Sequence, residues 1–154
     1  MHRNAKRVQE ALAAKGLDIE VVQVPESTRT AQEAADALGI TVAQIAKSIV
    51  FTLGESGVVV VASGVNRIDE AKVSSLIGAP IGRANADDVR RLTGFPIGGV
   101  PPLAHTTEVE VLIDEDLLAF EEIWAAAGTP NAVFRTTGRE LHESTGARVA
   151  NIKA

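Results

Sequence analysis

The spacing of hydrophobic residues along the chain follows two periods, one typical of helices and one typical of strands. Apolar residues three or four positions apart predict amphipathic helices, whereas alternation or short β-branched runs predict strands. The helical pattern predicts helices at residues 4–15, 30–38, 41–47, 69–77, 85–93, 115–127 and 137–145. The strand pattern predicts strands at residues 19–24, 48–53, 58–63, 80–83, 108–113, 132–135 and 147–152.

Local signatures mark where several of these helices begin and end. Segments 30–33, 41–44 and 137–140 each place a threonine three residues before Glu or Gln, the arrangement of a capping box. Glycines follow the expected ends of several helices, as is typical of helix C-termini. The helix expected at 115–127 would turn three side chains toward the core, namely Leu118, Ile123 and Trp124.

The strand patterns indicate how the sheet is covered. Residues 58–63 are nearly all apolar, which predicts a strand buried on both faces. Residues 48–53 alternate, and the tight Gly54–Gly57 segment joins the two strands. Because some neighbouring elements are joined by tight turns and others through helices, we predict an α/β fold. It would have a mixed, partly barrel-like β-sheet with surrounding helices, in a single domain spanning residues 1–154.

Composition narrows the classes of function. The chain has no cysteine, and its three histidines are far apart, so we expect no metal site. A net charge of −5 and 3% aromatic residues argue against DNA binding and against coating of nucleic acid, but not against gripping one RNA end. No signal peptide or membrane-spanning run is apparent, which predicts a cytoplasmic protein with no membrane partner.

Common catalytic motifs are missing. The chain contains neither a Walker A motif nor a dinucleotide-binding GxGxxG after a strand, and it has no GxSxG nucleophile elbow. His105 and Asp114 could be drawn into a triad with a serine, but one loop histidine and one loop aspartate are the simpler interpretation.

The most site-like stretch is the glycine-proline loop from Gly98 to Pro102. Its two glycines allow positive φ angles and close approach of a ligand, and its two prolines stiffen the chain. The N–H groups of Gly98, Gly99 and Val100 could then converge on a carbonyl or oxyanion. An ordinary rigid turn explains the same residue types equally well.

Lys47 is the second candidate, because it lies where a short helix gives way to a buried-looking strand. At such a junction a lysine either reaches to solvent or points into a cleft, where its ammonium group could bind a carbonyl or phosphate oxygen. The residues alone favour the solvent interpretation.

Taken together, three segments resemble a known family. The strings TAQEAA at 30–35, QIAKSIVF at 44–51 and TGFPIGGVPP at 93–102 resemble the YbaK/prolyl-tRNA-synthetase-associated (ProX-like) family. The similarity extends over nearly the whole chain. The resemblance implies a domain that hydrolyses mischarged aminoacyl-tRNA, acting on tRNA(Pro) or a similar tRNA that carries a small amino acid. It implies no cofactor and no metal, and it names the mischarged tRNA acceptor end, with an aminoacyl-tRNA synthetase, as partners.

The resemblance also implies roles for particular residues. Lys47, Gly98 and Gly99 match catalytic positions of the family. Six further residues match or neighbour substrate-binding positions, namely Ser48, Val100, Pro102, His105, Gly128 and Thr129. In the alanine-specific branch an asparagine follows the lysine and a pocket histidine comes later, whereas this chain has Ser48 and no histidine near Asn131, so alanine specificity is not implied.

Two other functions fit the same residues. One is a non-catalytic binding module for amino acids or tRNA acceptor ends. The other is an interaction protein that keeps only the fold, although the presence of both Lys47 and the glycine pair speaks against it.

Overall fold

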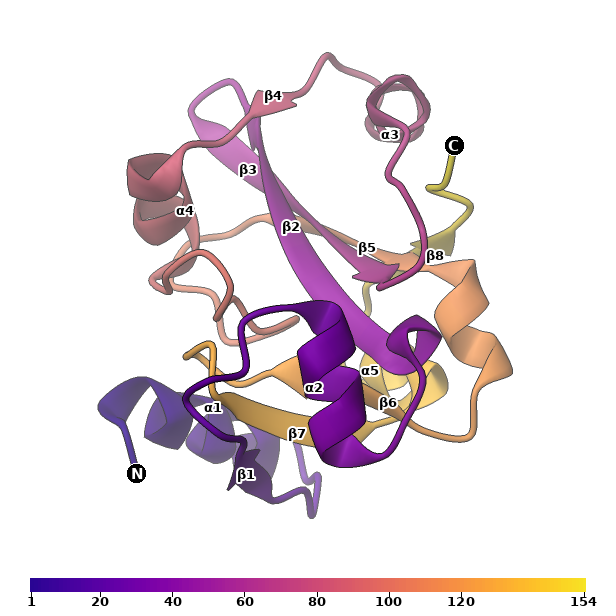
Figure 1. Cartoon of the computed structure of the whole chain (residues 1–154). Helices are drawn as coiled ribbons and strands as arrows, with labels where there is room; N and C mark the ends of the chain where they lie inside the picture. Colours follow the sequence, from indigo (N-terminus) through magenta and orange to yellow (C-terminus); the bar gives the residue numbers. More distant parts are fainter.

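Eight strands form one mixed sheet, and five helices surround it (Figure 1). The computed structural model describes every residue from 1 to 154. The helices are α1 (Arg3–Ala14), α2 (Ala31–Leu38), α3 (Glu70–Ile77), α4 (Ala86–Thr93) and α5 (Gly138–Thr145), with short 3-10 helices η1 (Val42–Gln44) and η2 (Glu115–Ala119). The strands are β1 (Val21–Gln23), β2 (Ile45–Leu53), β3 (Ser56–Ser63), β4 (Gly82–Arg83), β5 (Glu110–Asp114), β6 (Ile123–Ala126), β7 (Ala132–Thr136) and β8 (Arg148–Ala150).

The strand order confirms the predicted mixed sheet. The strands lie in the order β1-β7-β6-β2-β3-β5-β8, and β4 pairs with β2 outside this path. The β2–β6, β3–β5 and β5–β8 pairs are parallel, and the other pairs are antiparallel. Strand β2 therefore has three partners: β3 along one edge, and β6 and β4 at the two ends of the other.

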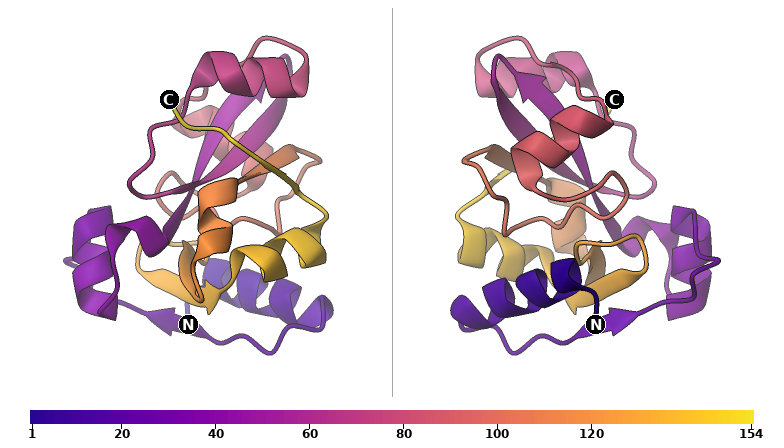
Figure 2. Two further views of the ribbon diagram at one scale, coloured as in Figure 1. Left: turned by 90° about the vertical axis from the view of Figure 1, so that its right-hand side faces the viewer. Right: turned by 90° about the vertical axis from the view of Figure 1, so that its left-hand side faces the viewer.

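The capping signals act as predicted at several helices. The Thr30 side chain accepts a hydrogen bond from Glu33 N–H at the start of α2, and the Thr137 side chain accepts one from Glu140 N–H at the start of α5. Such caps satisfy donors that the first helical turn leaves without intrahelical partners. Helix α2 lies at the outer side of the molecule beside the start of β2 (Figure 2).

Two predicted helices are wrong. The segment 115–127 forms only the short η2 and then strand β6, which pairs with both β2 and β7. Strand pairing overrides the helical spacing from Ile123 onward, and Leu118, which lies in η2, is 40% exposed instead of facing the core. The helix expected at 41–47 is the single turn η1, and β2 begins at Ile45, earlier than predicted.

The core has two parts, one on each face of the β2–β3 hairpin. Residues Val58 to Ser63 of β3 are all buried, as the apolar run predicts. Val50 packs in a main cluster of 22 buried residues, whereas Phe51 packs in a smaller cluster of eight. Adjacent side chains of β2 thus point to opposite faces, which confirms the predicted alternation. No helix is long and apolar enough to span a membrane.

Candidate functional site

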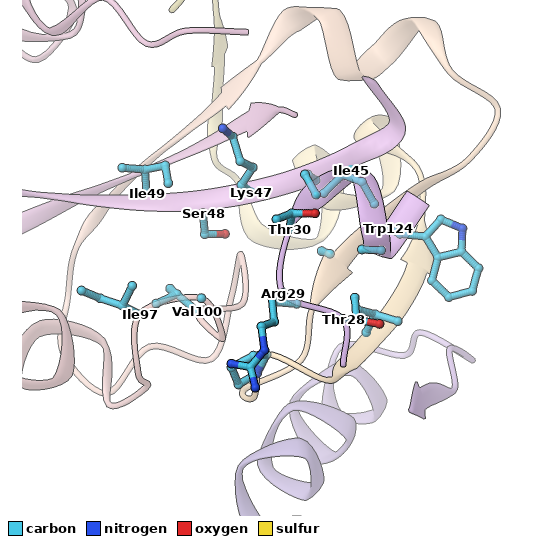
Figure 3. A pocket seen from close by; sticks show the side chains of 18 of the residues that line it. Thr28, Arg29, Thr30, Ile45, Lys47, Ser48, Ile49, Ile97, Val100 and Trp124 are labelled. Carbon is cyan, nitrogen blue, oxygen red and sulfur yellow. The ribbon is translucent and has the colours of Figure 1, made fainter. Parts of the chain in front are cut away.

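A cavity of about 410 Å³ lies against the edge of β2 (Figure 3). Its walls come from the start of α2 and the segment before it, from β2, from α4 and the segments on either side of it, and from β6 and β7 with the turn between them. The lining is mainly hydrophobic. It consists of Thr28, Arg29, Thr30, Ala31, Ala34, Ile45, Ala46, Lys47, Ser48, Ile49, Val50, Ala84, Val89, Ile97, Gly98, Val100, Trp124, Ala125, Ala126, Pro130 and Val133.

The charged groups in this lining are all positive. Arg29 and Lys47 are its two charged residues, and neither forms an ion pair with a carboxylate. The lining contains no aspartate, glutamate or histidine. The pocket is therefore suited to a ligand that carries negative charge or develops it during a reaction.

The middle of β2 has an open edge toward this pocket. Strand β6 pairs with β2 only at Ile45 and Ala46, and β4 pairs with it only at Phe51 and Thr52. The segment 47–50 therefore has no partner strand on the side away from β3. Because Ile45 C=O accepts from Gly64 N–H on the β3 side, the alternating peptide groups of Ser48 and Val50 face the open edge. A strand edge of this kind offers main-chain donors and acceptors to a ligand.

Ser48 and Lys47 contribute to the pocket from opposite sides of this edge. In Figure 3 the Ser48 side chain points toward Val100, and the Lys47 side chain extends from the other side of the ribbon. The Ser48 hydroxyl is buried without a hydrogen-bond partner. A buried hydroxyl without a partner is destabilising, so its position in a pocket marks it as a group available to a ligand.

The Gly98–Pro102 loop forms the facing wall, but its amides are not all free. Gly99 N–H donates to Pro96 C=O at 3.0 Å, and Gly98 has a φ of 84°, so this segment is a tight turn with glycine at the third position. The expectation of three free N–H groups is therefore wrong at Gly99. The N–H groups of Gly98 and Val100 donate no hydrogen bond within the protein.

What approaches Gly99 closely is the protein's own backbone. A Cβ atom at Gly99 would lie 2.8 Å from the Cα atom of Thr129, and Gly99 C=O accepts from Gly128 N–H at 2.9 Å. Gly128 is itself held against α1, where Asn4 Nδ2 donates to its carbonyl at 3.2 Å. The loop and the turn after β6 are thus locked together, with Gly99, Gly128 and Thr129 behind the pocket wall.

Pro102 and His105 also lie outside the cavity lining. The ring of His105 is largely buried, and its Nε2 atom lies 2.7 Å from Pro101 C=O. Burial lowers the pKa of His105 below its usual value, and the hydrogen bond to the backbone opposes part of that shift. The structure thus brings Lys47, Ser48, Gly98 and Val100 together in one pocket.

Sequence reasoning missed much of the lining. Thr28, Arg29, Ile49, Ile97 and Trp124 line the pocket, although only Trp124 had been singled out, as a core residue. Its indole Nε1 is buried without a partner, and β6 directs the ring toward the end of the cavity farthest from Ile97 (Figure 3). No local pattern marks these residues, since they come from distant loops and strands that only the tertiary fold brings together.

A second hollow has the opposite electrostatic character. Trp124 lines both this hollow and the first pocket. Its lining includes five acidic residues, Asp18, Glu20, Glu121, Glu122 and Glu140, against the single cation Arg135. Phosphate groups would be repelled from this hollow, so the first pocket is the one suited to a polyanion.

Comparisons with known proteins identify the family of this chain. Residues 25–143 match the family described as the aminoacyl-tRNA editing domain. The uncharacterized protein YwhH of Bacillus subtilis is 30% identical over 131 residues, which cover 84% of this chain and 83% of that protein. The proline–tRNA ligase of Lactobacillus acidophilus is 27% identical over 107 residues, which cover 69% of this chain but only 19% of the ligase.

The fold matches solved structures as well. A crystal structure described as a candidate trans-editing enzyme for prolyl-tRNA synthetase has a TM-score of 0.96 and 48% identity, and the match covers 100% of this chain and 99% of that one. The hypothetical protein APE2540 has a TM-score of 0.89 and 34% identity over 96% of this chain and 99% of that one. The chain belongs to the aminoacyl-tRNA editing domain family.

Proposed function

We propose that this protein is a trans-editing deacylase, which hydrolyses the ester between an amino acid and the terminal ribose of a mischarged tRNA. One observation supports this most directly: the apolar pocket is edged by unpaired main-chain groups and has only cations among its charged residues. An ester carbonyl needs donors for its developing oxyanion, and the tRNA end needs cations for its phosphates. Membership of the aminoacyl-tRNA editing domain family supports a tRNA ester as the substrate.

The proposed substrate is tRNA(Pro), or a similar tRNA, that carries a small amino acid. The candidate trans-editing enzyme that this chain resembles is described as acting for prolyl-tRNA synthetase, and proline–tRNA ligases match the chain. Apolar walls around the unpartnered Ser48 hydroxyl suit a short side chain and exclude bulky ones by size. Such a pocket separates near-isosteric amino acids poorly. We propose a synthetase as the partner that releases the mischarged tRNA.

In the proposed reaction a water oxygen attacks the ester carbonyl, the bond to the ribose oxygen breaks, and that oxygen takes up a proton. We assign donation to the oxyanion to the N–H groups of Gly98 and Val100, which have no partner within the protein, together with the open edge at Ser48. Lys47 extends from the other side of this edge, which favours anchoring a phosphate or ribose oxygen rather than the carbonyl. Because the lining contains no carboxylate or imidazole, we assign activation of the water to a ribose hydroxyl of the substrate.

Replacement of Lys47 tests this function. In a panel of mischarged tRNAs, Lys47→Ala should lower kcat/KM on the preferred substrate by about 10- to 100-fold, the loss expected for one charge-assisted contact. Lys15→Ala, an exposed lysine of the region after α1, is the matched control and should keep wild-type rates. Wild-type rates for Lys47→Ala would contradict the proposed anchoring role.

A non-catalytic binding module is the second candidate, and the missing general base in the pocket favours it. Such a module would bind charged acceptor ends and show no turnover. Release of the amino acid from any mischarged tRNA at catalytic protein concentration excludes this candidate.

A further inference from the structure

Five polar or charged residues of the chain are almost completely buried, and Thr28 is the one whose side chain forms no hydrogen bond within the protein. The hydroxyls of Ser63, Thr93 and Thr136 each donate a hydrogen bond at 2.7 Å. The Asp114 carboxylate accepts one from Ser63 N–H at 3.0 Å. Thr28 is 8% exposed and lines the pocket. Because a buried hydroxyl without a partner is costly, this hydroxyl is available to a group that enters the pocket.

Hydrogen bonds of the surrounding backbone fix Thr28 at the wall of the pocket. Its N–H donates to Pro25 C=O at 2.9 Å, which closes a turn, and Asn131 Nδ2 donates to the same carbonyl at 3.0 Å. Val24 N–H donates to Asn131 C=O at 2.8 Å, so the turn is tied to the residue that precedes β7. Thr30, two residues later, already uses its hydroxyl to cap α2. Thr28 is therefore in place before any ligand arrives.

The most buried part of the pocket lining is built from short side chains. Its members are Thr28, Ala46, Val50, Val89, Val100, Ala125 and Val133. None of these side chains is larger than valine, and the Thr28 hydroxyl is the only polar side-chain group among them. A small ligand group that enters this part of the pocket therefore meets apolar walls and one hydroxyl that lacks a partner.

We propose that Thr28 is a specificity-determining residue, whose hydroxyl forms a hydrogen bond with a hydroxyl group in the side chain of the amino acid that is removed. This inference rests on the proposed function, because it names the amino acid of the same ester. The substrate class is a small amino acid with a hydroxyl on its β-carbon, of which serine is the smallest. Shape alone separates serine from alanine poorly, but a buried polar group favours the substrate that pairs with it.

Position and charge favour the side-chain hydroxyl over the other polar groups of the ester as the partner of Thr28. In Figure 3 Thr28 and Trp124 lie at one end of the pocket, whereas Val100, which we assign to the ester carbonyl, lies at the other. The α-amino group is a cation when protonated, and Arg29, the next residue of the chain, is a cation of the same lining. A neutral hydroxyl meets no such repulsion, and it can both donate to and accept from the Thr28 hydroxyl.

Binding of two stable analogues to the full chain tests this role without requiring hydrolysis. In these analogues an amide joins serine or alanine to the ribose of adenosine, so they differ by one hydroxyl. Calorimetry should give a Kd about tenfold lower for the serine analogue, the effect of one hydrogen bond in a buried site. Thr28→Val, which nearly keeps the shape and removes the hydroxyl, should abolish this difference, and Thr28→Ser should restore it. Thr136→Val, which removes a buried threonine hydroxyl outside the lining, is the matched control and should keep the difference.

Kinetics on charged tRNA separate this inference from the proposed function. Thr28→Val should lower the ratio of kcat/KM for tRNA(Pro) charged with serine to kcat/KM for tRNA(Pro) charged with alanine by about tenfold. Equal binding of the two analogues by the wild-type protein, or a serine preference that survives Thr28→Val, would overturn the role of Thr28 and leave the deacylase in place. An equal loss of affinity for both analogues in Thr28→Val would pair the hydroxyl with a group that they share, which also overturns it. A serine preference that depends on Thr28, in a protein that hydrolyses no charged tRNA, would support the inference and refute the deacylase.

Discussion

The loop wall of the pocket, residues 96–100, and the strand wall, residues 47–50, differ in what their backbones bond to. In the loop wall both peptide groups of Gly99 are engaged, its N–H by Pro96 and its C=O by Gly128. In the strand wall the peptide groups of Ser48 face an edge that neither β4 nor β6 covers, and the Ser48 hydroxyl has no partner. The loop therefore supplies mainly shape, and the strand supplies most of the unused hydrogen-bonding capacity.

The largest expected effect is on the loop wall. Gly99→Val should lower the free energy of unfolding by about 3 kcal/mol, because its Cβ atom would lie 2.8 Å from the Thr129 Cα atom and backbone would have to move. Urea denaturation measures this loss. If Gly99→Val kept wild-type stability and lost only activity, the glycine would serve a ligand rather than the fold, and the contrast between the walls would fail.

The next effect is on the strand wall and appears in activity rather than stability. Ser48→Ala should lower kcat/KM by about tenfold, since one neutral hydrogen bond to the substrate is lost, while thermal stability stays the same or rises slightly. Ser63→Ala is the matched control on β3, where the hydroxyl donates to Ala43 C=O at 2.7 Å. This control should lose about 1 kcal/mol of stability and keep its activity.

A reversed pattern for the two serines would contradict the strand-wall assignment. Ser48 would then be a structural residue with a partner in solution, and Ser63 would be the one that acts on the substrate.

The sequence predicts the parts of these walls that depend on interactions between neighbouring residues. It does not predict the parts that depend on pairing between distant segments. Turn and cap chemistry is local, so the Gly98–Pro102 loop and the α2 and α5 caps are readable from residue types. The open edge of β2 depends on where β4 and β6 stop pairing, which no local pattern encodes. The same long-range pairing turned the helical spacing of residues 115–127 into strand β6.

A smaller stability effect should follow from Gly98, whose φ is 84° but whose added Cβ atom would meet only Pro130 Cγ at 3.9 Å. Gly98→Ala should therefore lose about 1 kcal/mol, from backbone strain alone. Gly16→Ala, with a φ of 76° and nothing within 4 Å, measures the same strain far from the pocket and should lose a similar amount. A loss at Gly98 that exceeds the loss at Gly99 would show that the turn, not its contact with Thr129, fixes the loop wall.

The smallest expected effect is a pH dependence that reaches the loop wall alone. Burial holds the pKa of His105 below the value of 6.5 that it has in the unfolded chain, so the unfolded chain takes up a proton first as the pH falls. The stability contributed by neutral His105 is complete above pH 6.5 and declines from there down to the lowered pKa of the folded state. His105→Gln should flatten this part of the profile of unfolding free energy against pH. Because His105 Nε2 contacts Pro101 C=O, protection factors for hydrogen exchange, which are corrected for the intrinsic rate at each pH, should fall on acidification first at the loop and not at the amides of β2. An equal loss of protection in both walls would mean that they open as one unit, and the two walls would then differ in their hydrogen bonding but not in their dynamics.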